Sequence, residues 1–183
     1  MALSASAKDY LSRFSPGPPS PLWETDPEFM ELFANFALDE VVNQGDLDDA
    51  ARMMAILAAL LGCQGVEEYR VLLPAALRAG VTPVQVKEIL YQSVPYLGIG
   101  RVRPFFSVTN QVLTEQGVAL PLEPGSTTTA ETRLAAGNQA QVDICGAFRT
   151  AARRKAATST AGWRTTASAT TTPAGGWTIS SGK

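Results

Sequence analysis

Residues 77–86 read LRAGVTPVQV, a stretch that ends one helix and begins another. Gly80 suits a helix C-terminus, where the left-handed conformation costs glycine little. Thr82 can cap the next helix, and Pro83 fits the first position of that helix. Apolar residues at positions 86, 89, 90, 94 and 97 then recur at helical spacing. The stretch therefore predicts two helices joined by a short turn.

The same signals recur on both sides of this turn. Asp26, Pro27 and Glu28 are a cap, a first-turn proline and an early acid in the expected order, and a stop follows at 43–45. Further helices are predicted from Asp46 or Asp48 to 61, over 67–79 and over 104–117, and Pro74 requires a kink or a late start in the second of these. No segment alternates apolar and polar residues as a half-buried strand does. We predict an all-α domain of about five to six helices over residues 22–120.

Two apolar patterns within this domain predict burial. Phe29, Phe33 and Phe36 have the spacing of core residues. Residues 53–61 leave almost no polar face, so their helix is expected to be buried on all sides, in the core or at a subunit interface. At about 15 residues the apolar run is too short to span a membrane.

The segments outside this domain have a different composition. Residues 15–21 read SPGPPSP and predict a stiff extended segment, so residues 1–21 are interpreted as a proline-rich lead-in with the first helix after it. Residues 121–129 are a predicted linker, and residues 130–183 begin as a helix. After Asp143 there is no Leu, Val or Met, and Thr, Ala, Ser and Gly dominate, which predicts a disordered tail outside the core.

Charge changes at the same point. Six of the fifteen Lys and Arg residues, and none of the seventeen Asp and Glu residues, follow Asp143, so the two parts carry −8 and +6. An acidic folded part gives no reason to expect a nucleic-acid partner. Without a secretory signal, a membrane span or a disulfide framework, we expect a cytoplasmic protein that binds no membrane. The sequence predicts no cofactor and no metal ion.

Three motifs, in order along the chain, resemble those of a known family. GDLDDAAR at 45–52, followed by AALRAGVTP at 75–83 and VKEI at 86–89, resembles the carboxymuconolactone decarboxylase family, which includes the alkylhydroperoxidase-D-like proteins. The resemblance covers about residues 22–120. It implies a helical domain that assembles as a homo-oligomer, often a trimer or hexamer, and sometimes occurs twice in one chain.

The catalytic groups that the resemblance implies are absent. Peroxidase-like members use a Cys-x-x-Cys pair and a nearby His, whereas this chain has Cys63 alone and no histidine anywhere. Decarboxylase-like members have a His and a Glu at the positions that Leu72 and Met53 occupy here. With no histidine, the usual general base near neutral pH is missing.

Five residues remain as candidates for a site. Cys63 is either a lone peroxidatic thiol or a small apolar residue at a helix end. Glu68 is either a catalytic base raised in pKa by burial or a solvated acid in a first helical turn, and Tyr69 beside it could bind substrate. Glu88 is a pocket acid or a surface charge. Arg101 could hold an anionic substrate or serve a structural role.

A reading-frame hypothesis accounts for the unusual tail. If the codons of residues 158–183 are read one nucleotide out of frame, they can encode HINSGLADNCFGDYYTRGRLDYKQRE. The end of that string parallels residues 47–53 and carries the acid that Met53 replaces. We therefore interpret residues 130–183 as the start of a truncated second domain that runs into a frameshifted tail.

Two classes of function follow. The first is an enzyme that handles a lactone or another small molecule, or a peroxide with peroxiredoxin-type activity. The second is a non-catalytic helical oligomerisation domain left by truncation of a two-domain enzyme. Turnover that depends on Cys63 distinguishes them.

Overall fold

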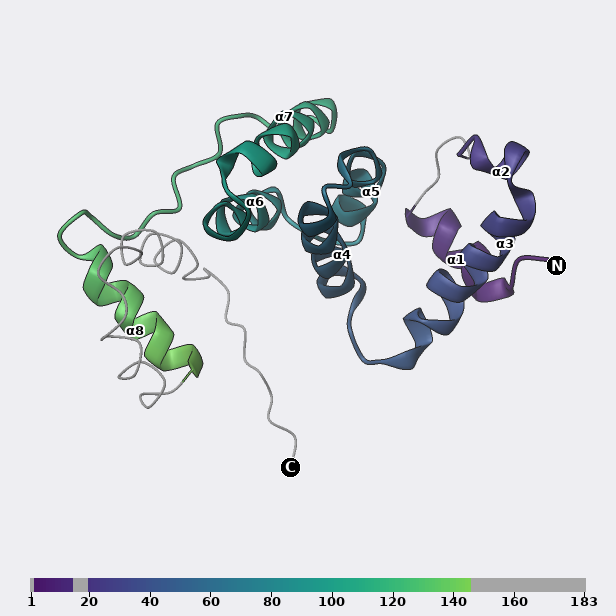
Figure 1. Cartoon of the computed structure of the whole chain (residues 1–183), viewed down its shortest axis with the longest axis horizontal. Coiled ribbons are helices and arrows are strands. Elements are labelled where there is room, and N and C mark those ends of the chain that lie inside the picture. The colour runs from purple at the N-terminus through teal and green to yellow at the C-terminus, as the bar shows by residue number, and fades with distance from the viewer. Residues whose placement is uncertain (1, 15–19, 146–183) are drawn as a thin grey trace.

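The computed structural model describes residues 2–14 and 20–145, with side chains described as far as Asp143. Every regular element in these ranges is helical, which confirms the all-α prediction (Figure 1). The predicted disordered tail and the frameshift hypothesis concern residues that lie almost entirely outside the described ranges.

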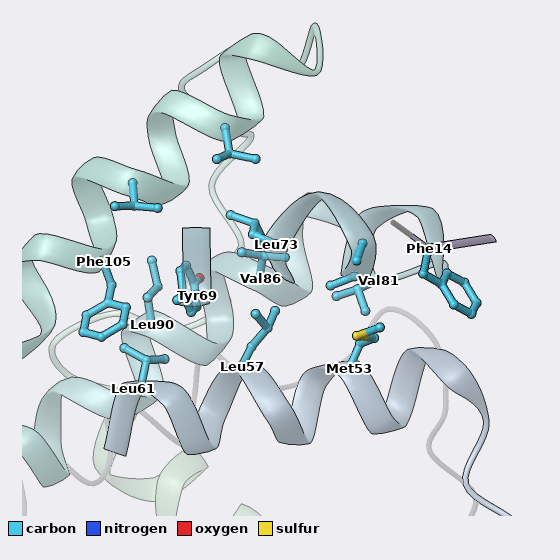
Figure 2. Close-up of a cluster of buried hydrophobic side chains, with 14 of the residues drawn as sticks. Phe14, Met53, Leu57, Leu61, Tyr69, Leu73, Val81, Val86, Leu90 and Phe105 are labelled. Atoms are coloured by element: carbon cyan, nitrogen blue, oxygen red, sulfur yellow. The ribbon is translucent and has the colours of Figure 1, made fainter. Parts of the chain in front are cut away.

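Four helices form the centre of the fold: α4 (Asp49–Cys63), α5 (Val66–Arg78), α6 (Pro83–Leu97) and α7 (Ile99–Glu115). Helix α6 packs against α4 and α7, and α5 also packs against both of them. Figure 2 shows Met53, Leu57 and Leu61 of α4 pointing toward residues of α5 and α6. The core that they share is closed by Leu73, Leu90 and Phe105, all fully buried. Burying such a side chain stabilises a fold by roughly 1.5–3 kcal/mol.

Local capping fixes two helix starts where the sequence places them. The Asp48 carboxylate accepts a hydrogen bond of 2.7 Å from the Ala51 amide and caps α4. Thr82 and Gln85 form a reciprocal capping box at α6, with Pro83 in the first turn. Both arrangements satisfy amide donors that a helix N-terminus leaves unpaired.

Helix α7 begins earlier than the sequence predicts. Its expected start was Pro104, but it begins at Ile99 and runs through that proline. The chain leaves the helical conformation at Gly98, between α6 and α7. Glycine adopts the φ of 82° found there readily, whereas other residues are strained at this value. Helix α5 likewise continues through Pro74.

The N-terminal residues form a helix that the sequence analysis missed. The prediction that the first helix follows residues 15–21 is wrong, because α1 (Ala5–Phe14) precedes them and α2 (Leu22–Thr25) comes next. Ala7, Tyr10 and Phe14 lie on one face of α1 and are buried. Helix α1 contacts α5, and the Arg78 guanidinium donates to the Phe14 carbonyl oxygen.

The predicted burial of three phenylalanines is also wrong. They belong to α3 (Pro27–Asn35) and to the π-helical turn η1 (Phe36–Glu40), which a short turn η2 (Val42–Gln44) follows. Phe29, Phe33 and Phe36 are 58%, 51% and 58% exposed. Helix α3 packs mainly against α2 and η1, and Ala34 is its one buried residue, so none of the elements within residues 2–14 and 20–145 covers its aromatic side.

The described residues bury helix α4 on one side only. Ala55, Ala58 and Ala59 are exposed on the other side, so these residues do not bury the helix on all sides as the sequence predicts, and burial at a subunit interface stays a prediction. After α7, residues 116–132 contain no regular helix and lead to α8 (Arg133–Cys145), close to the predicted start at residue 130.

Candidate functional site

Cys63 ends α4 with its side chain exposed. Its Sγ donates weakly to the Leu60 carbonyl oxygen at 3.6 Å, a contact within its own helix. Gln64 follows with a positive φ of 63°, and the turn brings Gly65 close to the thiol: a Cβ added at Gly65 would lie 3.5 Å from Sγ. The thiol is therefore free and accessible.

Glu68 and Tyr69 follow each other in the first turn of α5 but point to different environments. Glu68 is exposed. Tyr69 is fully buried, its hydroxyl is hydrogen-bonded to Thr109 at 3.0 Å, and its ring meets Phe105 edge-on at 5.1 Å. Burial raises the pKa of Tyr69 to about 12, because the core disfavours the phenolate. Tyr69 thus contributes to the core and lines neither of the two clefts described below.

The two positions where the family carries polar groups are packed with apolar side chains. Met53 is 3% exposed and belongs to the core cluster of buried residues. Leu72 is partly buried and packs against the same cluster. Neither side chain can transfer a proton, so these positions supply no acid or base.

A cleft of about 390 Å³ lies between α6, α7 and residues 120–124. Lys87, Glu88 and Tyr91 of α6 line it, Asn110 contributes from α7, and Leu122 and Glu123 close the opposite side. Burial raises the pKa of Glu88. The Gln92 side-chain amide donates a hydrogen bond of 3.3 Å to the Glu88 carboxylate, and this bond lowers the pKa and offsets part of the rise. The cleft combines charged groups of both signs with an apolar wall.

A second, more apolar groove of about 500 Å³ lies between α4 and α6. Met54 and Ala58 form one side, and Ile89, Tyr96 and Leu97 form the other. Glu88 borders this groove as well as the first cleft.

The structure separates the five candidates that the sequence suggested. Glu88 lines both clefts, whereas Cys63, Glu68, Tyr69 and Arg101 line neither. Arg101 lies exposed in the first turn of α7. The five residues therefore do not form one catalytic group.

Sequence reasoning missed Lys87 and Asn110 as cleft residues. Lys87 lies three and seven residues before Leu90 and Val94, on the apolar side of its helix, and a charged residue at such a position is a signal of a partnered or functional group. Its Nζ donates to Asn110 Oδ1. Burial lowers the pKa of Lys87, since the ammonium form is the one that loses hydration.

The described ranges contain neither a cluster of metal ligands nor a membrane-spanning helix. Residues 2–14 and 20–145 contain no cluster of three His, Cys, Asp or Glu side chains that could hold a metal ion. In the same ranges no helix has the length and apolar character needed to cross a membrane.

The central part of the chain is similar to a known protein family. The carboxymuconolactone decarboxylase family matches residues 27–111, which run from the first residue of α3 into α7. No curated protein and no solved structure gave a significant match. The matched region contains the LRAGVTPVQV turn and the motifs that carry the resemblance. Residues 27–111 of this chain are therefore similar to the carboxymuconolactone decarboxylase family.

Proposed function

We propose that this chain is a self-associating helical domain that catalyses neither of the reactions that the family resemblance implies. The observation that carries the proposal is the aromatic face of α2, α3 and η1, defined by Leu22, Phe29, Leu32, Phe33 and Phe36, each about half exposed. Large contiguous apolar faces on a protein surface are typical of interaction sites. Burial of the exposed half of each phenylalanine would contribute roughly 1 kcal/mol to association.

The partner that we propose is a second copy of the chain. Each copy also has the apolar groove between α4 and α6, so one copy's aromatic face could pack into the next copy's groove. Such a contact joins two different surfaces and is heterologous, and a heterologous contact forms a ring when its rotation closes. A trimer, or a hexamer built from two such rings, fits this geometry and the family resemblance.

The lack of family-type catalysis is supported by the packing of two residues. Met53 and Leu72 occupy the positions of the family's Glu and His and belong to the core or pack against it. The chain contains no histidine that could replace the missing base. Under the frameshift hypothesis the catalytic groups belong to a second domain, and the nucleotide sequence around codon 144 tests this: an early stop in the shifted frame would exclude it.

Light scattering coupled to size exclusion tests self-association. We expect the wild type to elute as an oligomer and Phe33→Asp to elute as a monomer, because an aspartate at a buried interface loses its hydration. Val71→Asp is the matched control, since Val71 is equally exposed on α5 but lies outside the aromatic face. A monomeric wild type, or equal effects of the two substitutions, would refute the proposed interface.

A second candidate function is a thiol peroxidase that acts through Cys63. The exposure of its thiol favours this candidate. The thiolate would attack the peroxide to give a sulfenic acid and an alcohol, and two external thiols would then restore it and release water as they form a disulfide. A reducing cytoplasm, the compartment that we propose, would supply such thiols. Peroxide consumption that disappears in Cys63→Ser would establish this function, whereas an inactive wild type would exclude it.

A further inference from the structure

Lys87 carries a buried charge in the cleft between α6, α7 and residues 120–124 and forms no ion pair with a described residue. Its side chain is 9% exposed. Its Nζ donates to the neutral amide oxygen of Asn110, and no carboxylate in the described ranges lies within ion-pair distance of it. A buried ammonium that lacks an opposite charge is costly, so a bound carboxylate group would be stabilised there.

Two carboxylates line the same cleft. Glu88 comes from α6 beside Lys87, and Glu123 comes from the segment that closes the opposite side. Neither forms an ion pair with a described residue. A purely anionic molecule would meet two like charges in this cleft, and a purely cationic one would meet Lys87. A molecule that carries both charges complements all three groups.

The other residues that line the cleft indicate the size and polarity of the uncharged part of a ligand. Val84, Leu120 and Leu122 give apolar surface. Tyr91 also lines the cleft, and its ring packs in a tilted arrangement against Phe106, with 5.8 Å between the ring centroids. The volume of about 390 Å³ lies toward the small end of ligand sites, which span roughly 300–1,000 Å³. This space suits a compact molecule with an aliphatic or aromatic side group.

We propose that this cleft binds a small zwitterion of the amino-acid class, with its carboxylate on Lys87, its ammonium group facing Glu88 and Glu123, and its apolar side group against Tyr91 and Leu122. This site is independent of the aromatic face on α3 and of Cys63. It therefore adds a ligand-binding function that neither candidate function includes.

Three matched probes test the charges of the ligand. Calorimetry on the full chain compares L-phenylalanine with 3-phenylpropionate, which lacks the amine, and with phenethylamine, which lacks the carboxylate. Since a charge-assisted hydrogen bond contributes about 1.5 kcal/mol or more, we expect L-phenylalanine to bind about tenfold more tightly than either analogue. Equal or tighter binding of 3-phenylpropionate would replace the proposal with an anion site, and no binding of L-phenylalanine or L-leucine would overturn it.

Substitutions then identify which residue binds each charged group of the ligand. Lys87→Met should remove the preference for L-phenylalanine over phenethylamine, and the double variant Glu88→Gln, Glu123→Gln should remove its preference over 3-phenylpropionate. Arg101→Met, an exposed position outside the cleft, should leave all three affinities unchanged. Circular dichroism verifies that each variant is folded. Unchanged preferences in folded cleft variants would overturn the proposal, whatever the oligomeric state of the protein.

Discussion

The Tyr69 hydroxyl oxygen lies 3.0 Å from Thr109 Oγ1, and this hydrogen bond joins α5 to α7 inside the core. Both side chains are fully buried. A buried hydroxyl that loses its partner keeps the full cost of its lost hydration, so the two groups depend on each other. The pair is therefore a buried polar link between the two helices.

We expect Tyr69→Phe to lower the free energy of unfolding by about 1–2 kcal/mol, because it leaves the Thr109 hydroxyl without its partner. Thr109→Val should have a similar effect. The double variant should be less destabilised than the sum of the two, since it leaves no orphaned group. Urea unfolding of the four proteins measures this coupling. Strictly additive effects would mean that the hydrogen bond contributes nothing of its own.

The raised pKa of Tyr69 also predicts a dependence of stability on pH. The unfolded tyrosine titrates near pH 10 and the folded one near 12, so between these values the unfolded state has released a proton that the folded state keeps. The contribution of Tyr69 to stability is thus fully present below pH 10, and roughly 3 kcal/mol of stability is lost as the pH rises through 12. Tyr69→Phe lacks this loss. Below pH 10 the wild type is more stable than Tyr69→Phe by about 1–2 kcal/mol. This advantage should shrink as the pH rises and reverse by about pH 12, because the pH-dependent loss is the larger of the two, and parallel unfolding curves would contradict the assignment.

Features that depend on neighbouring residues could be predicted from the sequence. The capping box of Thr82 and Gln85 spans four residues, and its geometry follows from their identities. The all-α class follows similarly, because helical periodicity is a property of single segments. In α1 the buried residues Ala7, Tyr10 and Phe14 stand at helical spacing, so the signal was present but the proline-rich stretch after it obscured it.

Features that depend on distant segments could not be predicted. Periodicity identified the apolar side of α3 but not whether another element covers it, and here none of the described elements does so for Phe33. The burial of Lys87 depends on Asn110 and on residues 120–124, which lie more than 20 residues away in the sequence. The candidate site therefore emerged only from the packing of helices on one another.

Substitution by alanine should change the stability of the fold in opposite directions at two glycines, one inside a helix and one between two helices. Gly62 lies inside α4, and a Cβ there would meet nothing within 4 Å, so Gly62→Ala should stabilise the fold by about 0.5–1 kcal/mol through helix propensity. Gly98 separates α6 from α7 with φ 82° and ψ 147°, a conformation that other residues rarely adopt. Gly98→Ala should therefore destabilise the fold by about 1–3 kcal/mol although space is open. Thermal unfolding compares them, and a shift of both in one direction would contradict the backbone argument.

The contact between Arg78 and the Phe14 carbonyl predicts how α1 is held. The Arg78 Nε donates to that oxygen at 3.1 Å, and Nη2 donates to the same atom. Because the side chain is partly hydrated, we expect Arg78→Met to cost about 1 kcal/mol and to speed local opening of α1 about fivefold. Hydrogen exchange should show faster exchange of amides in α1 and unchanged exchange in α4 and α7.

Arg101→Met is the control for loss of a positive charge, because no hydrogen bond joins Arg101 to α1 in the described ranges. Unchanged exchange in α1 of Arg78→Met would show that burial of Tyr10 and Phe14 alone holds this helix.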